Sequence, residues 1–210
     1  GGTESSNTAI RAAVRDLGCR HIISSLIEHH AVTHTVEYLA NADGVKVSYV
    51  KLLPNGHVDL KDLERLLSAS SEKTLVSLMH ANNEIGNILD IHAVGNLCKT
   101  YKAIFHSDTV QTVGHFPFDL RNTAVHFITG AAHKFHGPKG VGFLYISNKV
   151  SISPFIYGGS QERNMRGGTE NLYGIVGLGK ALEIANRDMV EHQNHIVGVK
   201  NYMIEQLKAA

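Results

Sequence analysis

The sequence predicts an α/β fold in which helices cover both faces of a mostly parallel central sheet, giving a three-layer α/β/α arrangement. Two observations support this prediction. Short runs typical of β-strands alternate along the chain with amphipathic segments of helical period. The 210 residues suffice for one substantial domain with a core, and no repeat or low-complexity segment interrupts them.

The predicted elements alternate along the chain. Strands are expected at residues 21–25, 45–50, 74–79, 103–106, 126–129 and 141–146. Helices are expected at residues 4–17, 31–39, 60–67, 91–101 and 171–210, the last with a break near Arg187 and Asp188. Thr3 is expected to cap the first helix, and Gly18 to end it in a left-handed conformation. Asp59 is expected to cap the third helix.

The chain opens on a loop that leads into a helix, with no strand before it. This start suggests a piece of a longer protein. Residues 1–187 are expected to form one large domain that lacks its N-terminal segment. Residues 188–210 are expected to form a helix that leads towards a smaller C-terminal domain outside this chain.

The composition is ordinary for a soluble globular protein, with 43% hydrophobic and 19% charged residues. A formal net charge of +1 gives no electrostatic reason to expect binding to nucleic acid or to a membrane. No apolar run approaches the length of a membrane span. The only two cysteines, Cys19 and Cys98, are expected to be reduced structural residues, as in a cytoplasmic protein.

Residues 131–140 carry the strongest chemical signal. Lys134 lies beside His133, directly after one β-rich run, and glycine and proline then force a tight loop before the next run. A lysine in this position could trap a carbonyl compound, provided that desolvation or a neighbouring cation helps its ammonium group to lose a proton. A solvated loop lysine is the alternative interpretation.

Six polar side chains share a place just past the ends of predicted strands: His29, Asn83, Asp108, Gln111, His133 and Lys134. In open α/β sheets the carboxyl ends of the strands form the ligand-binding edge, so this sheet would bring the six side chains to one rim. Taken singly, each has a simpler interpretation. Asp108 could be a helix cap, His29 a surface histidine, and Asn83 and Gln111 turn residues.

A lysine paired with an aspartate is the mark of a pyridoxal phosphate site. The start of the helix near Thr3 could take the phosphate, because backbone N–H groups point out of a helix N-terminus. Zinc is the competing hypothesis, since the chain has 14 histidines. However, neither His29-His30 nor the pair His133 and His136 has the spacing of a strong zinc motif, so no metal site is expected.

Several segments together resemble the cysteine desulfurases, the NifS/IscS-like branch of the class V aminotransferases, in the family's order and spacing over essentially the whole chain. The matching segments are Gly2-Thr3-Glu4-Ser5, Glu28-His29-His30-Ala31-Val32, Met79-His80-Ala81-Asn82-Asn83-Glu84-Ile85-Gly86, Asp108-Thr109-Val110-Gln111, His133-Lys134 with Gly137-Pro138-Lys139-Gly140, and Arg166-Gly167-Gly168-Thr169. The resemblance implies the large domain of a fold type I pyridoxal phosphate enzyme.

The resemblance also implies a role for each side chain around the cofactor ring. Lys134 would carry the cofactor as a Schiff base and then move protons. Asp108 would pair with the pyridinium nitrogen, and His29 would stack on the ring and assist proton transfer. Gln111 would donate a hydrogen bond to the phenolic oxygen, with Asn83 near that oxygen and the substrate carboxylate.

Three further residues are implied to hold phosphate. Thr3 and His133 would bind the phosphate of their own subunit, and Thr169 would reach that of the neighbouring subunit, so a homodimer is implied. The implied reaction converts L-cysteine to L-alanine. The sulfur would leave as a persulfide for an acceptor or scaffold protein, such as those of iron–sulfur cluster assembly.

Two departures from the family pattern stand out. Ala131 occupies a position where the family usually has a phosphate-binding serine. The lost hydrogen bond would weaken cofactor binding by roughly 1.5–3 kcal/mol unless water or Thr129 compensates. The family's nucleophilic cysteine lies well beyond the active lysine, and neither Cys19 nor Cys98 matches it. This chain alone is therefore expected to bind the cofactor at most and to turn over no sulfur.

Three alternatives stay open at this point. One is a selenocysteine lyase or another class V enzyme. The second is a non-catalytic homologue that acts as a binding scaffold, for which Ala131 gives slight support and the intact Lys134, Asp108 and His29 speak against. The third, a metal-dependent hydrolase, is remote.

Overall fold

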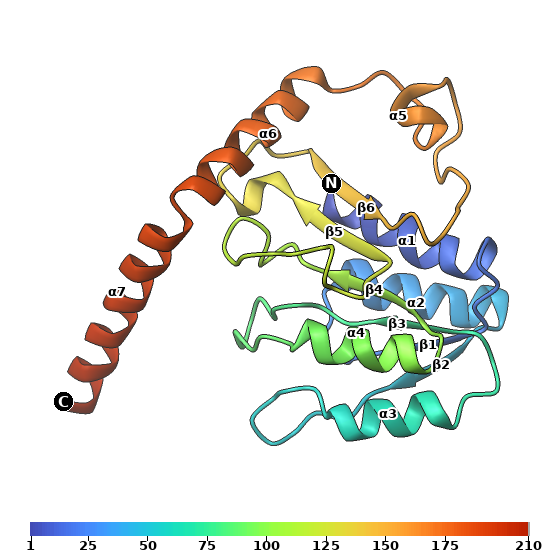
Figure 1. Ribbon diagram of the computed structural model, residues 1–210, viewed down its shortest axis with the longest axis horizontal. Helices are drawn as coiled ribbons and strands as arrows, with labels where there is room; N and C mark the ends of the chain where they lie inside the picture. Colours follow the sequence, from blue (N-terminus) through green and yellow to red (C-terminus); the bar gives the residue numbers. More distant parts are fainter. Residues whose placement is uncertain (210) are drawn as a thin grey trace.

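A computed structural model describes residues 1–209 and places a six-stranded sheet between two layers of helices (Figure 1). The strands are β1 (His21–Ser24), β2 (Lys46–Tyr49), β3 (Thr74–Ser77), β4 (Ile104–Asp108), β5 (Phe127–Ala131) and β6 (Gly142–Ile146). Their order across the sheet is β2-β1-β3-β4-β5-β6. The first five are parallel, and β6 pairs antiparallel with β5. The predicted α/β fold is confirmed.

The strand order reverses direction once. The chain passes from β1 to β2 on one side and then returns to place β3 on the other side of β1. In doubly wound sheets such a reversal opens a crevice at the carboxyl ends of the two strands, and ligands bind there. The connections that follow β1 and β3 therefore meet at this crevice.

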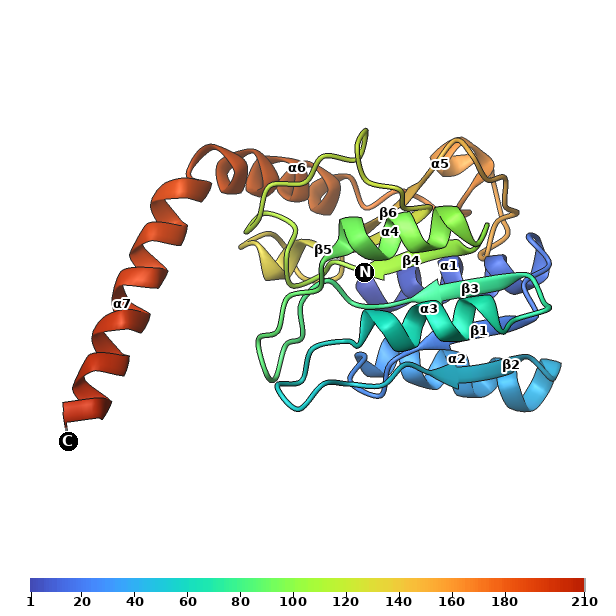
Figure 2. The ribbon, with the colours of Figure 1, turned by 60° about the horizontal axis from the view of Figure 1, so that its bottom comes forward.

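Two helices cover each face of the sheet (Figure 2). The helices are α1 (Gly2–Arg15), α2 (His30–Asp43), α3 (Leu60–Ser68), α4 (Ile91–Thr100), α5 (Gln161–Asn164), α6 (Leu172–Arg187) and α7 (Met189–Ala209). A short 3-10 helix, η1 (Ala132–Lys134), directly follows β5. Helices α1 and α2 pack on one face, and α3 and α4 on the other.

Side chains alternate along each strand between the two cores, as the pleat of a sheet requires. On β4, Ile104 joins the core under α1 and α2, whereas Phe105 joins the core under α3 and α4. On β5, Phe127 and Ile128 divide in the same way. Burial on both faces explains why apolar residues stand next to each other on these strands instead of alternating with polar ones.

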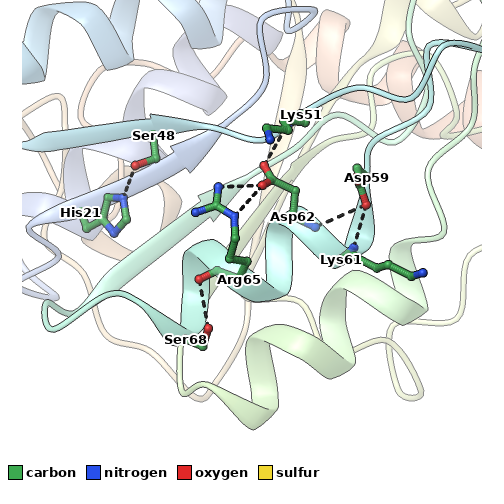
Figure 3. Close-up of polar contacts among 8 residues, drawn as sticks. All are labelled: His21, Ser48, Lys51, Asp59, Lys61, Asp62, Arg65 and Ser68. Atoms are coloured by element: carbon green, nitrogen blue, oxygen red, sulfur yellow. Dashed lines mark hydrogen bonds and ion pairs between the residues drawn. The ribbon is translucent and has the colours of Figure 1, made fainter.

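Helix α3 begins where the sequence predicts it. The Asp59 carboxylate accepts hydrogen bonds from the backbone N–H groups of Lys61 (2.9 Å) and Asp62 (3.3 Å), as Figure 3 shows. The buried Asp62 carboxylate accepts from the N–H of Lys51 (3.0 Å), which lowers its pKa, and pairs with Arg65 at 2.6 Å. This network ties the start of α3 to the chain that leaves β2.

The first helix differs from the prediction at its start. It begins at Gly2, with Gly1 as N-cap and no side-chain cap, so the prediction that Thr3 caps it is wrong. Packing against the sheet explains the earlier start. A Cβ atom on Gly2 would lie 3.0 Å from Val110 Cγ2 and 3.6 Å from Ala131 Cβ, so a glycine lets the helix begin in contact with the sheet. The left-handed conformation of Gly18 is confirmed, with φ +72°.

The C-terminal part of the described chain forms two helices with a break at Asp188, as predicted. Helix α6 packs against η1, where Ala185 joins Ala132 and Phe135 in a small core. Helix α7 extends away from the sheet (Figure 1). The division of the chain into domains after residue 187 stays a prediction. No helix within residues 1–209 combines the length and apolar character needed to cross a lipid bilayer.

Candidate active site

The structure brings three of the predicted residues together at the carboxyl end of the sheet. Asp108 is the last residue of β4 rather than a residue past the end of the strand. Lys134 ends η1, directly after β5, and His29 is the N-cap of α2. Neighbouring parallel strands end at the same edge, so their connections meet there.

The charges of His29 and Lys134 act on Asp108. The Asp108 side chain is buried, and burial raises the pKa of its carboxyl group above the ordinary value. A hydrogen bond from the backbone N–H of Val110 to Oδ1 (2.9 Å) opposes this shift. The nearby charged forms of His29 and Lys134 lower the pKa as well. The arrangement is a desolvated carboxylate facing two nitrogen-bearing side chains.

Each of the two basic side chains is carried by a firmly held backbone. His29 Nδ1 accepts a hydrogen bond from the N–H of Ala31 (3.1 Å), so a neutral imidazole there carries its proton on Nε2. The backbone carbonyl of Lys134 accepts from Nε2 of His115 (2.8 Å). The next residue, Phe135, is buried under α6. Fixed backbone with exposed side-chain ends suits groups that must reach a ligand.

The N-terminus of α1 lies beside the end of β5. The close contacts of Gly2 with Val110 and Ala131 put the exposed N–H groups of the first helical turn at the same rim as Asp108. A helix N-terminus favours an anion through these N–H groups and through the helix dipole. This place can therefore hold a phosphate group.

Thr129 cannot replace the hydroxyl group that Ala131 lacks. Its Oγ1 atom is engaged below the rim, where it hydrogen-bonds with Nε2 of His106 (3.1 Å) and with Oγ of Ser6 (3.4 Å). Its methyl group, rather than its hydroxyl group, lies on the side of Gly2, 3.8 Å from where a Cβ of that residue would be. The orientation of Thr129 therefore does not support compensation by its hydroxyl group.

Four other predicted residues are exposed or half-buried. Asn83 is exposed, and its side chain donates to Glu84 Oε1 (2.6 Å), as a turn residue can. Gln111 is half-buried in the turn after Asp108, and Thr3 and His133 are exposed at the start of α1 and in η1.

Thr169 lies in a different place. It lines a hollow of about 660 Å³ between α1, β6 and residues 155–178, together with Glu4 and Arg166. Glu4 and Arg166 form an ion pair of 2.8 Å across this hollow. None of Asp108, His29 and Lys134 is among the residues that line it.

Two buried residues at the rim were missed by the sequence analysis. Asn82 donates from Nδ2 to the carbonyl of Ile27 (2.7 Å), which ties the connection after β3 to the connection after β1. His80 hydrogen-bonds with Thr112 Oγ1 (2.9 Å), and burial lowers its pKa to about 4. The sequence does not show which of the neighbours Asn82 and Asn83 is buried, because burial depends on how the connections after β1 and β3 pack.

The whole sequence matches a known protein family. Residues 1–210 match the family described as Aminotransferase class-V. The chain belongs to the class V aminotransferases.

Its relatives within this family include cysteine desulfurases. It is 43% identical over 210 residues to the cysteine desulfurase IscS of Dictyoglomus turgidum, with 99% of this chain and 52% of the relative covered. It is 42% identical to the putative cysteine desulfurase IscS 1 of Bacillus subtilis, covering 100% of this chain and 55% of that one. A solved NifS-like protein superposes with a TM-score of 0.93 at 40% identity, covering 99% of this chain and 57% of that one. The chain thus spans about half the length of the curated relatives it matches.

Possible metal ligands and the two thiols are the other reactive side chains of this class V aminotransferase chain. Within residues 1–209, no three side chains of His, Cys, Asp or Glu come together in a way that could hold a metal ion. Both cysteines are free and fully buried, which agrees with the prediction that they are structural residues. Burial raises the pKa of the Cys19 thiol to about 11 and that of Cys98 to about 12. Neither thiol supplies a thiolate nucleophile at neutral pH.

Both thiols are therefore expected to react slowly with a disulfide reagent such as Ellman's reagent in the native chain, and rapidly once the chain is unfolded in guanidinium. The physical reason is that the thiolate is the reacting form and both sulfur atoms are shielded from solvent. Release of the coloured thiol, followed by absorbance, measures the two rates. Rapid reaction of either cysteine in the native chain would contradict its placement in the core.

Proposed function

We propose that this chain is the cofactor-binding part of a pyridoxal phosphate-dependent cysteine desulfurase. The enzyme would convert L-cysteine to L-alanine and pass the sulfur as a persulfide to an acceptor protein, such as one of iron–sulfur cluster assembly. The observation that carries the proposal is the grouping of Lys134, Asp108 and His29 at one rim of the sheet. Identity to cysteine desulfurases along the whole chain supports it.

The residues at this rim fit the cofactor. Pyridoxal phosphate needs an amine for its aldehyde, a carboxylate for its ring nitrogen and an anion site for its phosphate. Lys134 supplies the amine, and the buried Asp108 supplies the carboxylate. The N–H groups at the start of α1 supply the anion site, because Gly2 brings this end of the helix close to Ala131. When bound, the cofactor supplies an electron sink for negative charge that develops on the substrate.

Each side chain at the rim has a distinct task in this proposal. Lys134 binds the cofactor covalently and later accepts a proton from the substrate's α carbon with its freed amine. Asp108 keeps the proton on the ring nitrogen, because its carboxylate lies in a desolvated place where an ion pair is strong. His29 would stack on the ring, with Nε2 available for proton transfer because Nδ1 is engaged by the N–H of Ala31.

The remaining predicted residues serve binding. Thr3 and His133 would hold the phosphate together with the N–H groups at the start of α1. Gln111 and Asn83 would bind near the phenolic oxygen. Thr169 would hold the phosphate of a neighbouring subunit, and the active enzyme would then be a homodimer.

The proposal is tested with the full-length protein that contains this chain. We expect it to form L-alanine and sulfide from L-cysteine in the presence of a thiol reductant, and the Lys134→Ala variant to form neither. Activity limited to L-selenocysteine would instead indicate a selenocysteine lyase. Absence of cofactor binding by the full-length protein would indicate a non-catalytic homologue. The 210-residue chain alone is expected to form no sulfide, because both of its cysteines are buried.

Ala131→Ser is expected to strengthen cofactor binding by about tenfold, because it adds one charge-assisted hydrogen bond to the phosphate. Residue 131 is close to Gly2, whereas the next side chain, Ala132, belongs to the core under α6. Ala132→Ser is therefore the matched control, with no expected gain. The dissociation constants come from titration of the chain with pyridoxal phosphate, followed by absorbance. Equal affinity of Ala131→Ser and wild type would mean that the end of β5 does not face the phosphate.

A further inference from the structure

A second carboxyl group is buried near Asp108, and the proposed function does not use it. Glu28 lies in the connection after β1, directly before His29, and is 7% exposed. Its Oε1 atom accepts hydrogen bonds from Oγ of Ser25 and from the backbone N–H of Met79, each of 2.9 Å. Its Oε2 atom is buried and has no hydrogen-bond partner within residues 1–209.

The surroundings of Glu28 disfavour a negative charge. The nearby titratable groups are Asp108 at the end of β4, His57 in the turn before α3, and its chain neighbour His29. None of them forms a hydrogen bond or an ion pair with Glu28 in the described part of the chain. Glu28 and the exposed His57 line the same small hollow of about 20 Å³, which holds at most a single water molecule.

Two effects favour the protonated form of Glu28, and two hydrogen bonds oppose it. Burial raises the pKa of its carboxyl group to about 8, and the negative charge of Asp108 adds to this shift. The hydrogen bonds from Met79 and Ser25 oppose it but do not cancel it. Two carboxyl groups that interact in this way cannot both ionise freely, so one proton is retained between them. Glu28 is the group that keeps it, because the positive charges of His29 and Lys134 lower the pKa of Asp108, whereas burial raises the pKa of Glu28 to about 8.

The hydrogen bonds of Glu28 span the crevice where the strand order reverses. Its Oε1 atom joins the connection after β1 to the first residues after β3. The bond from Asn82 to the carbonyl of Ile27 ties the same two connections a second time. His29 directly follows Glu28 in the chain, so its place at the rim depends on this brace.

We propose that Glu28 is a protonated positioning residue, which braces the connection carrying His29 against the end of β3 and leaves Asp108 as the charged carboxylate of the site. The consequence for the cofactor rests on the proposed function. A second carboxylate would compete with Asp108 for the proton, and a protonated Asp108 could not pair with a positively charged ring nitrogen. Keeping the proton on Glu28 leaves the charge on Asp108.

The protonation state is tested by infrared spectroscopy on the wild-type chain and on Glu28→Gln. At neutral pH, the difference between the two spectra is expected to contain the carbonyl band of a protonated carboxylic acid. The band should disappear as the pH rises past about 8, the pKa to which burial raises this group. A carboxylate band in its place at neutral pH would overturn the proposal.

The pH dependence of stability provides a second test, because a side chain with a purely structural role would not alter it. The pKa of Glu28 is higher in the folded than in the unfolded chain, so wild type loses stability as the pH rises from about 4.3 towards about 8. Glu28→Gln lacks this proton. The ratio of its folding constant to that of wild type should therefore rise by up to about tenfold per pH unit in this window. A ratio independent of pH would contradict a protonated Glu28.

The brace is tested by cofactor affinity. Glutamine keeps an oxygen acceptor for Ser25 and Met79, so Glu28→Gln should bind pyridoxal phosphate nearly as well as wild type. Glu28→Ala removes both bonds and should bind about tenfold more weakly. Equal affinity of the alanine variant and wild type would overturn the positioning role, and an alanine variant that fails to fold leaves the two pH experiments to decide. Failure of wild type itself to bind the cofactor would instead refute the proposed function, while the infrared band would still report on Glu28.

Discussion

Asp108→Asn is expected to weaken binding of pyridoxal phosphate by about tenfold to a hundredfold, because the variant loses a charged partner for the ring nitrogen. Asparagine has almost the same shape and keeps an oxygen that can accept from the N–H of Val110. The change therefore removes charge and little else. Titration of the chain with the cofactor, followed by absorbance, gives the two dissociation constants.

The same substitution is expected to leave the free energy of unfolding unchanged or to raise it. Burial raises the pKa of Asp108 in the folded chain, so its ionised form destabilises the fold at neutral pH. This penalty is absent below the unfolded pKa of about 3.9 and develops as the pH rises through the folded pKa. Asparagine removes it. Urea unfolding at several pH values measures the difference, which should vanish in acid.

Asp119→Asn is the matched control for Asp108→Asn. The exposed Asp119 carboxylate accepts a hydrogen bond from the N–H of Arg121 (3.0 Å), two residues ahead, as Asp108 does from Val110. It lies in a loop outside the proposed site, so its substitution should not change cofactor affinity. Equal affinities of wild type and Asp108→Asn, or equal losses in both variants, would contradict the role of Asp108.

Gly142→Ala is expected to lower the free energy of unfolding by about 1–3 kcal/mol through overpacking. Gly142 lies at the start of β6, where a Cβ atom would be 2.5 Å from the carbonyl oxygen of Gly130 and 3.0 Å from Cα of Gly1. Both neighbours are backbone atoms, so relief requires β5, β6 or the start of α1 to move. Because that junction forms the proposed phosphate site, cofactor affinity should fall as well. Urea unfolding and cofactor titration measure the two effects.

Gly179→Ala is expected to raise the free energy of unfolding, the opposite of the effect of Gly142→Ala. Gly179 is exposed on α6, and a Cβ atom there would meet nothing within 4 Å. Alanine should therefore stabilise the helix by up to about 1 kcal/mol. A neutral Gly142→Ala variant beside a stabilised Gly179→Ala variant would show that β5, β6 and α1 are packed less tightly than the structure has them.

Local features of the fold could be predicted well from the sequence. Asp59 caps α3 and Gly18 is left-handed because capping and turn preferences depend on a few neighbouring residues. The start of α1 was predicted wrongly for the opposite reason. A residue such as Thr3 satisfies the local rule for a cap, but contact between Gly2 and the sheet lets the helix begin earlier.

The candidate site likewise has features that the sequence predicts and features that it does not. Lys134 and Asp108 were placed at one rim by the general rule that strand ends converge, and this placement agrees with the structure. The inward hydroxyl group of Thr129 and the buried carboxyl group of Glu28 could not be predicted. Both depend on side-chain orientation and on the packing of separate connections. The assigned roles at the site stay predictions.

The most direct test of the account is covalent trapping of the cofactor on the chain. Incubation with pyridoxal phosphate, reduction with borohydride and peptide mass spectrometry identify the lysine that carried the cofactor. We expect one adduct, on Lys134, and none in the Lys134→Arg variant. An adduct on another lysine, or no adduct with wild type under conditions where the chain is folded, would contradict the assignment of this rim as a pyridoxal phosphate site.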